Sequence, residues 1–331
     1  MTRLVQLRHG PRRAVALVQE PHLRLINAES IFALSSEAVN AKTFLTALVQ
    51  KRLTDVLLDY NSVYIGESEW RLLPAIDHPT EPTRCLVSGT GLTHLGSAQN
   101  RNAMHDAKES ELTDSMKMFK WGVEGGKPAP GKIGIAPEWF YKGNGGILRA
   151  HGEPLDVPAY GEDGGEEAEI AGVYLIGPDG QPRRIGMAIG NEFADHKFEK
   201  KNYLNLAGSK MRNCSLGPEL VIDPEFRSVP GKVAIERGGH EFWSKEIITG
   251  ENEMCHSLAN IEHHHFKFEE HRRPGDLHVH YFGACSLSLG AGIELADGDV
   301  MEIAFSGFGR PLRNWLRVAR GDKLIVAQPL G

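Results

Sequence analysis

The sequence predicts an α+β protein in which a small α/β domain, residues 1–80, precedes a mainly β domain, residues 81–331. Strand-like apolar runs dominate the chain after residue 85, whereas the one clear helix pattern lies before residue 61. Between them, the segment DHPTEPTR at residues 77–84 combines two prolines with turn-forming residues, which is typical of a linker. A chain of 331 residues is long enough for two domains of unequal size.

The first domain is predicted to mix short strands with a helix. The helix pattern is SSEAVNAKTFLTALVQKRLTDVLLDY, residues 35–60, in which Ser35, Ser36 and Glu37 resemble a capped start. In the second domain, residues 105–132 begin as a helix and end in glycine and proline, as a mobile lid over an active site does. The predicted strands of this domain span residues 85–88, 146–150, 168–176, 184–190, 219–222, 261–268, 277–283, 300–305 and 323–327.

The composition is that of an ordinary globular protein, with 41% hydrophobic and 24% charged residues. A net charge of -6, with no basic run that contains interleaved aromatic residues, argues against a nucleic-acid partner. Apolar stretches are too short for a transmembrane helix or a signal peptide, so we expect a cytoplasmic protein with no membrane partner. The four cysteines are far apart, which fits reduced thiols.

A predicted β-hairpin at residues 164–196 carries carboxylates at both ends. Asp179-Gly180 lies between two apolar runs and is a strong signal for a two-residue turn, because both residues tolerate a positive φ. With that turn, Pro178 would face Gln181, and the pairing of all other residues in the two strands follows.

This pairing brings three acids together. Glu167 falls opposite Glu192, and Glu169 shares a strand face with Glu167, about 6 to 7 Å along it. Like charges this close raise one another's pKa and destabilise the fold unless a proton or a cation lies between them. An all-oxygen site of this kind suits Mg²⁺, Mn²⁺ or Ca²⁺ better than zinc.

Two interpretations of these acids stay open at this point. Glu167 and Glu169 alone are typical of the solvated edge of a polar hairpin. The facing Glu192 and the nearly uncharged run IAGVYLIG, residues 170–177, favour a buried metal site instead. A β-bulge would slip the register by one residue and offer Asp195 in place of Glu192.

Three other motifs do not support a site. GKPAPGKI, residues 126–133, has the glycine spacing of a phosphate-binding loop, but Ile133 replaces the required Ser or Thr. GTGLTHLG, residues 89–96, lacks the spacing of a dinucleotide-binding fingerprint. His278 and His280 would share a strand face, as zinc ligands do, yet the spacing provides no third ligand.

The segment from Glu167 to Pro218 resembles the fumarylacetoacetate hydrolase superfamily, particularly its sugar-acid dehydratase branch. That superfamily carries a Glu-x-Glu strand, then Asn-Asp after a hairpin, then a lysine shortly before an LGP turn. In this chain, Glu192 stands where the family usually has aspartate. The corresponding motifs, in the same order, are EAE at 167–169, GNE at 190–192, GSK at 208–210 and SLGP at 215–218.

The resemblance covers roughly residues 85–320 and implies a roll of mixed β-sheet. It implies that Glu167, Glu169 and Glu192 hold Mg²⁺, with Mn²⁺ as an alternative. The metal would bind a small-molecule 2-oxo acid and act as a Lewis acid that stabilises its enolate. A homo-oligomer, either a dimer or a dimer of dimers, is also implied.

The dehydratase branch implies specific catalytic roles. Lys210 would be the base at C3, which requires a depressed pKa. Glu138, in the segment APEWFYKGNGG at residues 136–146, would be the acid that assists departure of the C4 hydroxyl. The substrate contacts that the resemblance implies are Ser97, Arg101, Gly283, Ala284 and Ser286, where Gly283-Ala284 replaces the family's usual Gly-Thr.

These roles imply dehydration of 2-keto-3-deoxy-pentonate to 2,5-dioxopentanoate, which is α-ketoglutarate semialdehyde. The alternative is hydrolysis of a C–C bond in a 2,4-diketo-3-deoxy sugar acid or an acylpyruvate, and a sensor that binds a sugar acid without turnover is a third hypothesis. Hydrolytic members generally use a His-Glu pair on the lid in His-x-x-Glu spacing. The residues available here, His94, His105, Glu109 and Glu111, do not have that spacing.

Overall fold

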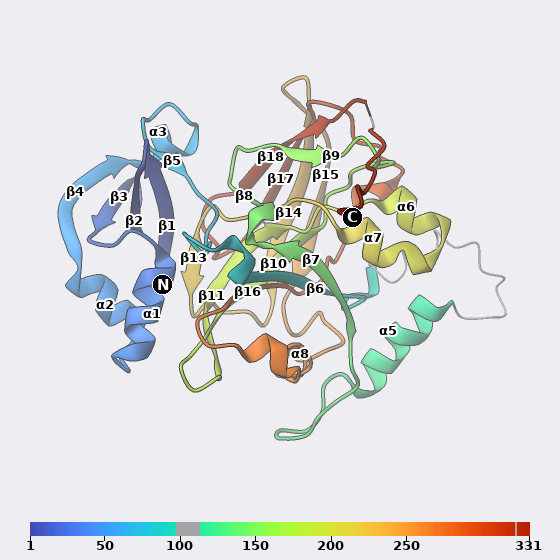
Figure 1. Cartoon of the computed structure of the whole chain (residues 1–331), viewed down its shortest axis with the longest axis horizontal. Coiled ribbons are helices and arrows are strands. Elements are labelled where there is room, and N and C mark those ends of the chain that lie inside the picture. The colour runs from blue at the N-terminus through green and yellow to red at the C-terminus, as the bar shows by residue number, and fades with distance from the viewer. Residues whose placement is uncertain (97–112, 322) are drawn as a thin grey trace.

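The structure, a computed structural model, describes residues 1–96, 113–321 and 323–331, in which two β-sheets dominate (Figure 1). The strands of the larger sheet are β1 (Thr2–His9), β2 (Arg12–Gln19), β3 (His22–Ile26), β4 (Leu53–Asp59), β5 (Arg71–Leu72), β6 (Cys85–Gly91), β7 (Glu138–Asn144), β8 (Leu148–Arg149), β10 (Ala168–Ile176), β11 (Pro182–Asn191), β12 (Cys214–Leu216), β13 (Leu220–Ile222) and β16 (Leu277–Tyr281). Those of the smaller sheet are β9 (Leu155–Val157), β14 (Val229–Arg237), β15 (His240–Thr249), β17 (Val300–Phe305) and β18 (Leu312–Val318).

Both sheets mix parallel and antiparallel pairs, and the α+β class is confirmed. The main path of the larger sheet is β4-β3-β2-β1-β13-β11-β10-β16-β6-β7, and the smaller sheet runs β15-β14-β17-β18-β9. Because β1 pairs with β13, the strands of the first 60 residues continue the larger sheet; the division at residue 80 stays a prediction. The α-helices of the described residues are α1 (Ile31–Asn40), α2 (Leu45–Lys51), α3 (Tyr60–Tyr64), α5 (Asp114–Gly125), α6 (His196–Lys201), α7 (Leu206–Lys210) and α8 (Leu258–Phe266).

The core lies on both faces of the hairpin formed by β10 and β11. On one face, Ile170 packs in a cluster with Val233 of the smaller sheet. On the other face, Val173 packs in a cluster with Leu34 of α1. All of β10 is buried, as residues 170–177 were expected to be. The acids at the open end of this hairpin therefore stand at the edge of a buried apolar core.

The turn of this hairpin differs from the prediction. Pro178, Asp179 and Gly180 form a three-residue loop, because the Gly177 N–H donates to the Gln181 carbonyl over 2.9 Å. Gly180 has a φ of +70°, the left-handed conformation that ends such loops without a steric penalty. The expected pairing of Pro178 with Gln181 is therefore wrong.

A β-bulge farther along the hairpin restores the predicted register. The pairing shifts by one residue between Val173 and Tyr174, which leaves Ile185 on β11 without an opposite residue. The extra residue in the bulge compensates for the extra residue in the loop. As predicted, Glu192 lies opposite Glu167, whose carbonyl accepts the Glu192 N–H over 3.0 Å.

The helix predicted for residues 35–60 is wrong in extent. Helix α1 begins earlier, because Ser30 rather than Ser35 is the N-cap and its Oγ accepts the Ala33 N–H over 3.1 Å. The chain leaves the helical conformation near Lys42, whose φ is +52°, and the rest of the pattern becomes α2 and strand β4. Pairing of β4 with β3 outweighs the helical pattern of its sequence.

Two predicted strands are also wrong. Most of residues 261–268 belong to α8, because Ser257 caps a helix that buries Leu258 and Ile261 at helical spacing. Residues 323–327 form no regular element, so their strand-like composition is not matched by any pairing in the described chain. None of the helices in the described residues has the length and apolar character needed to cross a bilayer.

Candidate functional site

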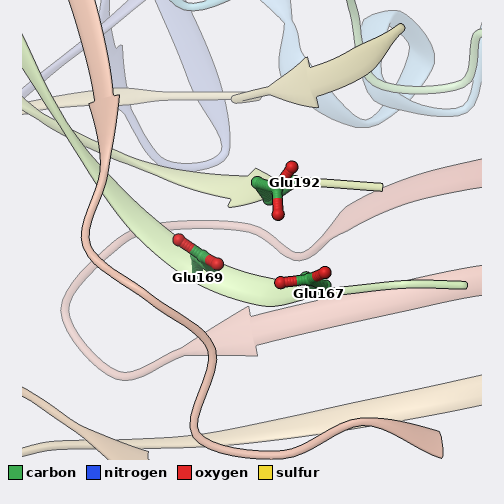
Figure 2. Close-up of side chains that lie close together, drawn as sticks. All are labelled: Glu167, Glu169 and Glu192. Carbon is green, nitrogen blue, oxygen red and sulfur yellow. The ribbon is translucent and has the colours of Figure 1, made fainter. Parts of the chain in front are cut away.

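Three glutamates form a buried cluster at the open end of the central hairpin. Glu167 and Glu169 lie at the start of β10, and Glu192 follows the end of β11 (Figure 2). Each offers one carboxylate oxygen, and these oxygens all lie within 4.8 Å of one another. The exposed fractions are 8% for Glu167, 1% for Glu169 and 0% for Glu192. The interpretation of these acids as a solvated edge is therefore wrong.

Like charges at this distance shift the pKa values. Burial and the two neighbouring carboxylates raise the pKa of Glu169 well above its ordinary value, and burial with Glu167 raises that of Glu192 to about 7. Burial would also raise the pKa of Glu167, but Lys210 and His196 outweigh it and hold that pKa well below its ordinary value. A buried cluster of carboxylates alone fits Mg²⁺ or Mn²⁺ better than zinc.

Lys210 lies between two of these carboxylates, at the end of α7. Its Nζ donates to Oε1 of Glu167 and to Oε2 of Glu192, each over 2.5 Å, and lies 4.7 Å from the centre of the Phe140 ring. Burial alone would lower the pKa of Lys210, but the two carboxylates outweigh it and raise that pKa. The depressed pKa expected of a base is therefore not produced by the protein's own groups and requires further positive charge beside the carboxylates.

A second buried lysine, Lys142 on β7, was not predicted. Its ammonium donates to the Glu192 carboxylate and to the main-chain carbonyls of Glu192 and Phe193, over 2.6 and 2.9 Å. The sequence did carry a signal for it, because Glu138, Phe140 and Lys142 alternate as one buried face of a strand does. Lys142 thus holds both the carboxylate and the main chain of Glu192 in place.

Glu138 begins β7 and is 6% exposed. Its carboxylate crosses neighbouring strand β6 at Gly91, and the Phe140 ring crosses at Gly89; a side chain at either glycine would clash. Since Glu138 and Phe140 share a strand face, Glu138 lies about 7 Å along that strand from the ring that covers Lys210. Gly89 and Gly91, whose spacing matches no glycine motif, thus make room for two side chains of the site.

The residues predicted to contact substrate include a group that supports the acidic cluster. The Gly283 N–H donates to Oε2 of Glu169 over 2.7 Å. Ser286 accepts a hydrogen bond from Lys245 over 2.9 Å, and Ala284 is buried. Gly283 thus orients a candidate metal ligand, while contact of these residues with substrate stays a prediction.

Part of the predicted lid can be placed. Residues 114–125 of this segment form helix α5, and residues 126–132 form no helix or strand. His94, which precedes the segment, is buried with its ring nitrogens bonded to Thr93 and Thr249. The predicted residues that lie outside the described ranges are Ser97, Arg101, His105, Glu109 and Glu111.

The alternative third ligand, Asp195, belongs to a different cluster. It is the N-cap of α6, where its carboxylate accepts the Phe198 N–H over 2.9 Å. The same carboxylate forms a buried ion pair with Arg212 at 2.7 Å. Glu192 rather than Asp195 therefore completes the group of three acids.

The zinc hypothesis for His278 and His280 finds no support. Both ring nitrogens of His280 are bonded, to Ser88 at 2.8 Å and Thr90 at 2.7 Å. Nδ1 of His278 lies 3.0 Å from Nε2 of His265. Within the described ranges, the group of metal-ligating side chains that comes close enough to hold an ion is the glutamate cluster.

We expect these histidines to make the protein sensitive to acid. Burial lowers the pKa of His278 and His280 to about 3 and that of His94 to about 4, from an ordinary value of 6.5. Below pH 6.5 the unfolded chain therefore binds more protons than the native protein. The free energy of unfolding should fall by ~1.4 kcal/mol per pH unit for each histidine as the pH drops toward 4. Urea unfolding between pH 7.5 and pH 5 measures this slope.

His278→Asn provides the control, because its amide oxygen can accept the His265 hydrogen bond but does not titrate. The free energy of unfolding of this variant should fall less steeply with decreasing pH than that of the wild type, by the ~1.4 kcal/mol per pH unit that one histidine contributes. Equal slopes would show that His278 is not neutral in the native protein.

No family model matches the sequence, and a search of curated proteins also found no match. Solved structures do match. A 2-keto-3-deoxy-D-arabinonate dehydratase, in its apo form and complexed with magnesium and 2,5-dioxopentanoate, superposes with a TM-score of 0.71 at 20% identity, over 96% of this chain and 100% of the other. A 5-carboxymethyl-2-hydroxymuconate delta-isomerase from Mycobacterium smegmatis matches with a TM-score of 0.57 at 16% identity, with the same coverage. The chain has the fold of these enzymes, as the motif resemblance implied.

Proposed function

We propose that the protein is a metal-dependent dehydratase that converts 2-keto-3-deoxy-pentonate to 2,5-dioxopentanoate. The observation that carries this proposal is the surroundings of Lys210: a buried lysine between two carboxylates, under an aromatic ring that shares its strand face with Glu138. This arrangement supports a site in which Lys210 is the base and Glu138 the acid. The dehydratase that was solved with magnesium and 2,5-dioxopentanoate has the same fold, which supports the proposal.

Each residue has one role in the proposed reaction. Glu167, Glu169 and Glu192 would hold Mg²⁺ or Mn²⁺, which supplies a Lewis acid that acidifies the C3 protons. Lys210 removes a proton from C3, and Glu138 donates a proton to the C4 hydroxyl, which leaves as water. Tautomerisation, in which C5 and its hydroxyl lose protons while C3 and C4 gain them, then yields the C5 aldehyde.

The test is incubation of the Mg²⁺-loaded protein with 2-keto-3-deoxy-pentonate and, separately, with a 2,4-diketo-3-deoxy acid, followed by NMR. Formation of 2,5-dioxopentanoate that stops with EDTA supports the dehydratase. Pyruvate and a hydroxy acid from the diketo compound alone would make the protein a C–C hydrolase. Metal binding without turnover of either compound would favour a sensor.

Glu138→Gln should lower kcat for dehydration roughly 100-fold and change KM little, because the amide keeps the shape of the side chain but is not an acid. Steady-state kinetics measures both constants, and Glu246→Gln, an exposed position on β15, is the control. A substrate analogue with fluorine at C4 should be affected far less, since fluoride leaves without a proton. An equal loss for both leaving groups would assign Glu138 another role.

A further inference from the structure

His196 lies directly behind the acidic cluster and has no role in the reaction described so far. It is the first residue of α6, it is 2% exposed, and its Nε2 lies 3.0 Å from Oε1 of Glu167. An ionised carboxylate can only accept hydrogen bonds, so Nε2 is the nitrogen that carries the proton. His196 is thus a donor aimed at one oxygen of a candidate metal ligand.

That oxygen already has another donor. Oε1 of Glu167 also accepts from Lys210, whereas no lysine, histidine or main-chain donor of the described residues bonds Oε2. Glu169 shows the same division, because its Oε2 accepts the Gly283 N–H while its Oε1 has no such bond to a described residue. In both glutamates, one oxygen is occupied by protein donors and the other is left for a metal.

In the proposed reaction, one of the two donors to Oε1 has to move and the other does not. Lys210 has to turn toward C3 of the substrate, and its bond to Glu167 then weakens or breaks. Among the described residues, the hydrogen bond of the His196 ring is to Glu167, and the ring is buried, so no other bond draws it away. It is the donor that remains when Lys210 leaves.

We propose that His196 is a positioning residue that holds Glu167 in its metal-binding orientation while Lys210 acts on the substrate. The inference rests on the proposed function, because only a base that moves to the substrate makes a second donor necessary. Donors behind a metal ligand fix its orientation, and their removal typically costs about 10- to 100-fold in metal affinity or activity.

The backbone around His196 is shaped for the imidazole. Gly165 lies so close that a Cβ there would clash with Nδ1 of His196. On the same side, a cavity of about 160 Å³ is lined by Gly165, His196 and Ser288, and Nδ1 has no hydrogen-bond partner among the described residues. Gly165→Ala therefore displaces the ring without removing it, and it tests the same contact independently.

The experiment titrates the full-length protein, freed of metal, with Mn²⁺ by calorimetry and measures kcat at saturating Mn²⁺. His196→Leu should weaken Mn²⁺ binding by about 10- to 100-fold, and Gly165→Ala should weaken it in the same direction. His196→Gln should bind nearly as tightly as the wild type, because its amide nitrogen can replace Nε2 as a donor. His151→Gln, a histidine that stacks on Tyr64 instead, is the control and should bind Mn²⁺ as the wild type does.

Unchanged Mn²⁺ affinity in folded His196→Leu would overturn the inference even if kcat falls, because His196 would then act on the substrate rather than on Glu167. If His196→Leu fails to fold, as judged by its thermal melt, Gly165→Ala and His196→Gln decide the question. A wild-type protein that binds Mn²⁺ but does not dehydrate would refute the proposed function, whereas the Mn²⁺ affinities of the variants would still show whether His196 orients Glu167. A dehydratase in which both His196→Leu and Gly165→Ala bind Mn²⁺ normally would refute this inference alone.

Discussion

Lys210→Met should lower kcat for dehydration roughly 1,000-fold while the protein still folds and still binds Mn²⁺. Methionine fills the buried space beneath the Phe140 ring but cannot accept a proton. It also removes the ammonium that occupies Oε2 of Glu192, the oxygen of that carboxylate that Lys142 leaves open, so Mn²⁺ binding should not weaken. Steady-state kinetics and calorimetry measure the two effects separately.

Proton exchange at C3 makes this prediction specific to a base. In D₂O, the wild type should exchange the C3 protons of the substrate, and Lys210→Met should not. Glu138→Gln should keep the exchange, because it impairs only the departure of the C4 hydroxyl. If Lys210→Met exchanges C3 protons at the wild-type rate, another group is the base.

Lys142→Met is the matched comparison, since Lys142 is also buried but its contacts are with Glu192 and Phe193. This variant should weaken Mn²⁺ binding and lower the free energy of unfolding, because Glu192 loses its charged support. C3 exchange at saturating Mn²⁺ should persist. Loss of exchange in Lys142→Met as complete as in Lys210→Met would show that the two lysines do not have separate roles.

Glu192→Gln should abolish dehydration and weaken Mn²⁺ binding by at least about 100-fold, more than the loss of a residue behind the ligands. The amide keeps the shape of the side chain but removes the charge that pairs with Lys142 and Lys210. Lys142 and Lys210 then lack part of the negative charge that compensates their buried ammonium groups, so the free energy of unfolding should fall by about 3 kcal/mol. Calorimetry with Mn²⁺ and urea unfolding measure the two effects.

The control is Glu166→Gln, a buried glutamate outside the cluster. Its carboxylate accepts the Ser288 N–H and hydroxyl, each over 2.7 Å, and it should bind Mn²⁺ as the wild type does. Equal Mn²⁺ affinity in Glu192→Gln and the wild type would remove Glu192 from the metal site. If Glu166→Gln loses as much Mn²⁺ affinity as Glu192→Gln does, the loss is not specific to the glutamate cluster.

The sequence by itself determined that three acids converge. Glu167 and Glu169 share a face because side chains alternate along any strand, and pairing from the predicted two-residue turn put Glu192 opposite Glu167. The turn prediction was nevertheless wrong by one residue, and the bulge at Ile185 corrected it. Such a compensation depends on how β10 and β11 pack between two cores, which no local rule describes.

Only the tertiary structure decided what surrounds the three acids. Lys142, His196 and Gly283 reach the acids from separate segments of the chain. Alternation along β7 indicates which face Lys142 lies on, but nothing in the three segments shows which acid each residue contacts. The GSK motif did single out Lys210, but only the structure shows that the neighbouring carboxylates raise its pKa rather than depress it. Alternation and turn chemistry act over a few residues, whereas burial, charge compensation and hydrogen bonds between distant segments exist only once the sheets have packed.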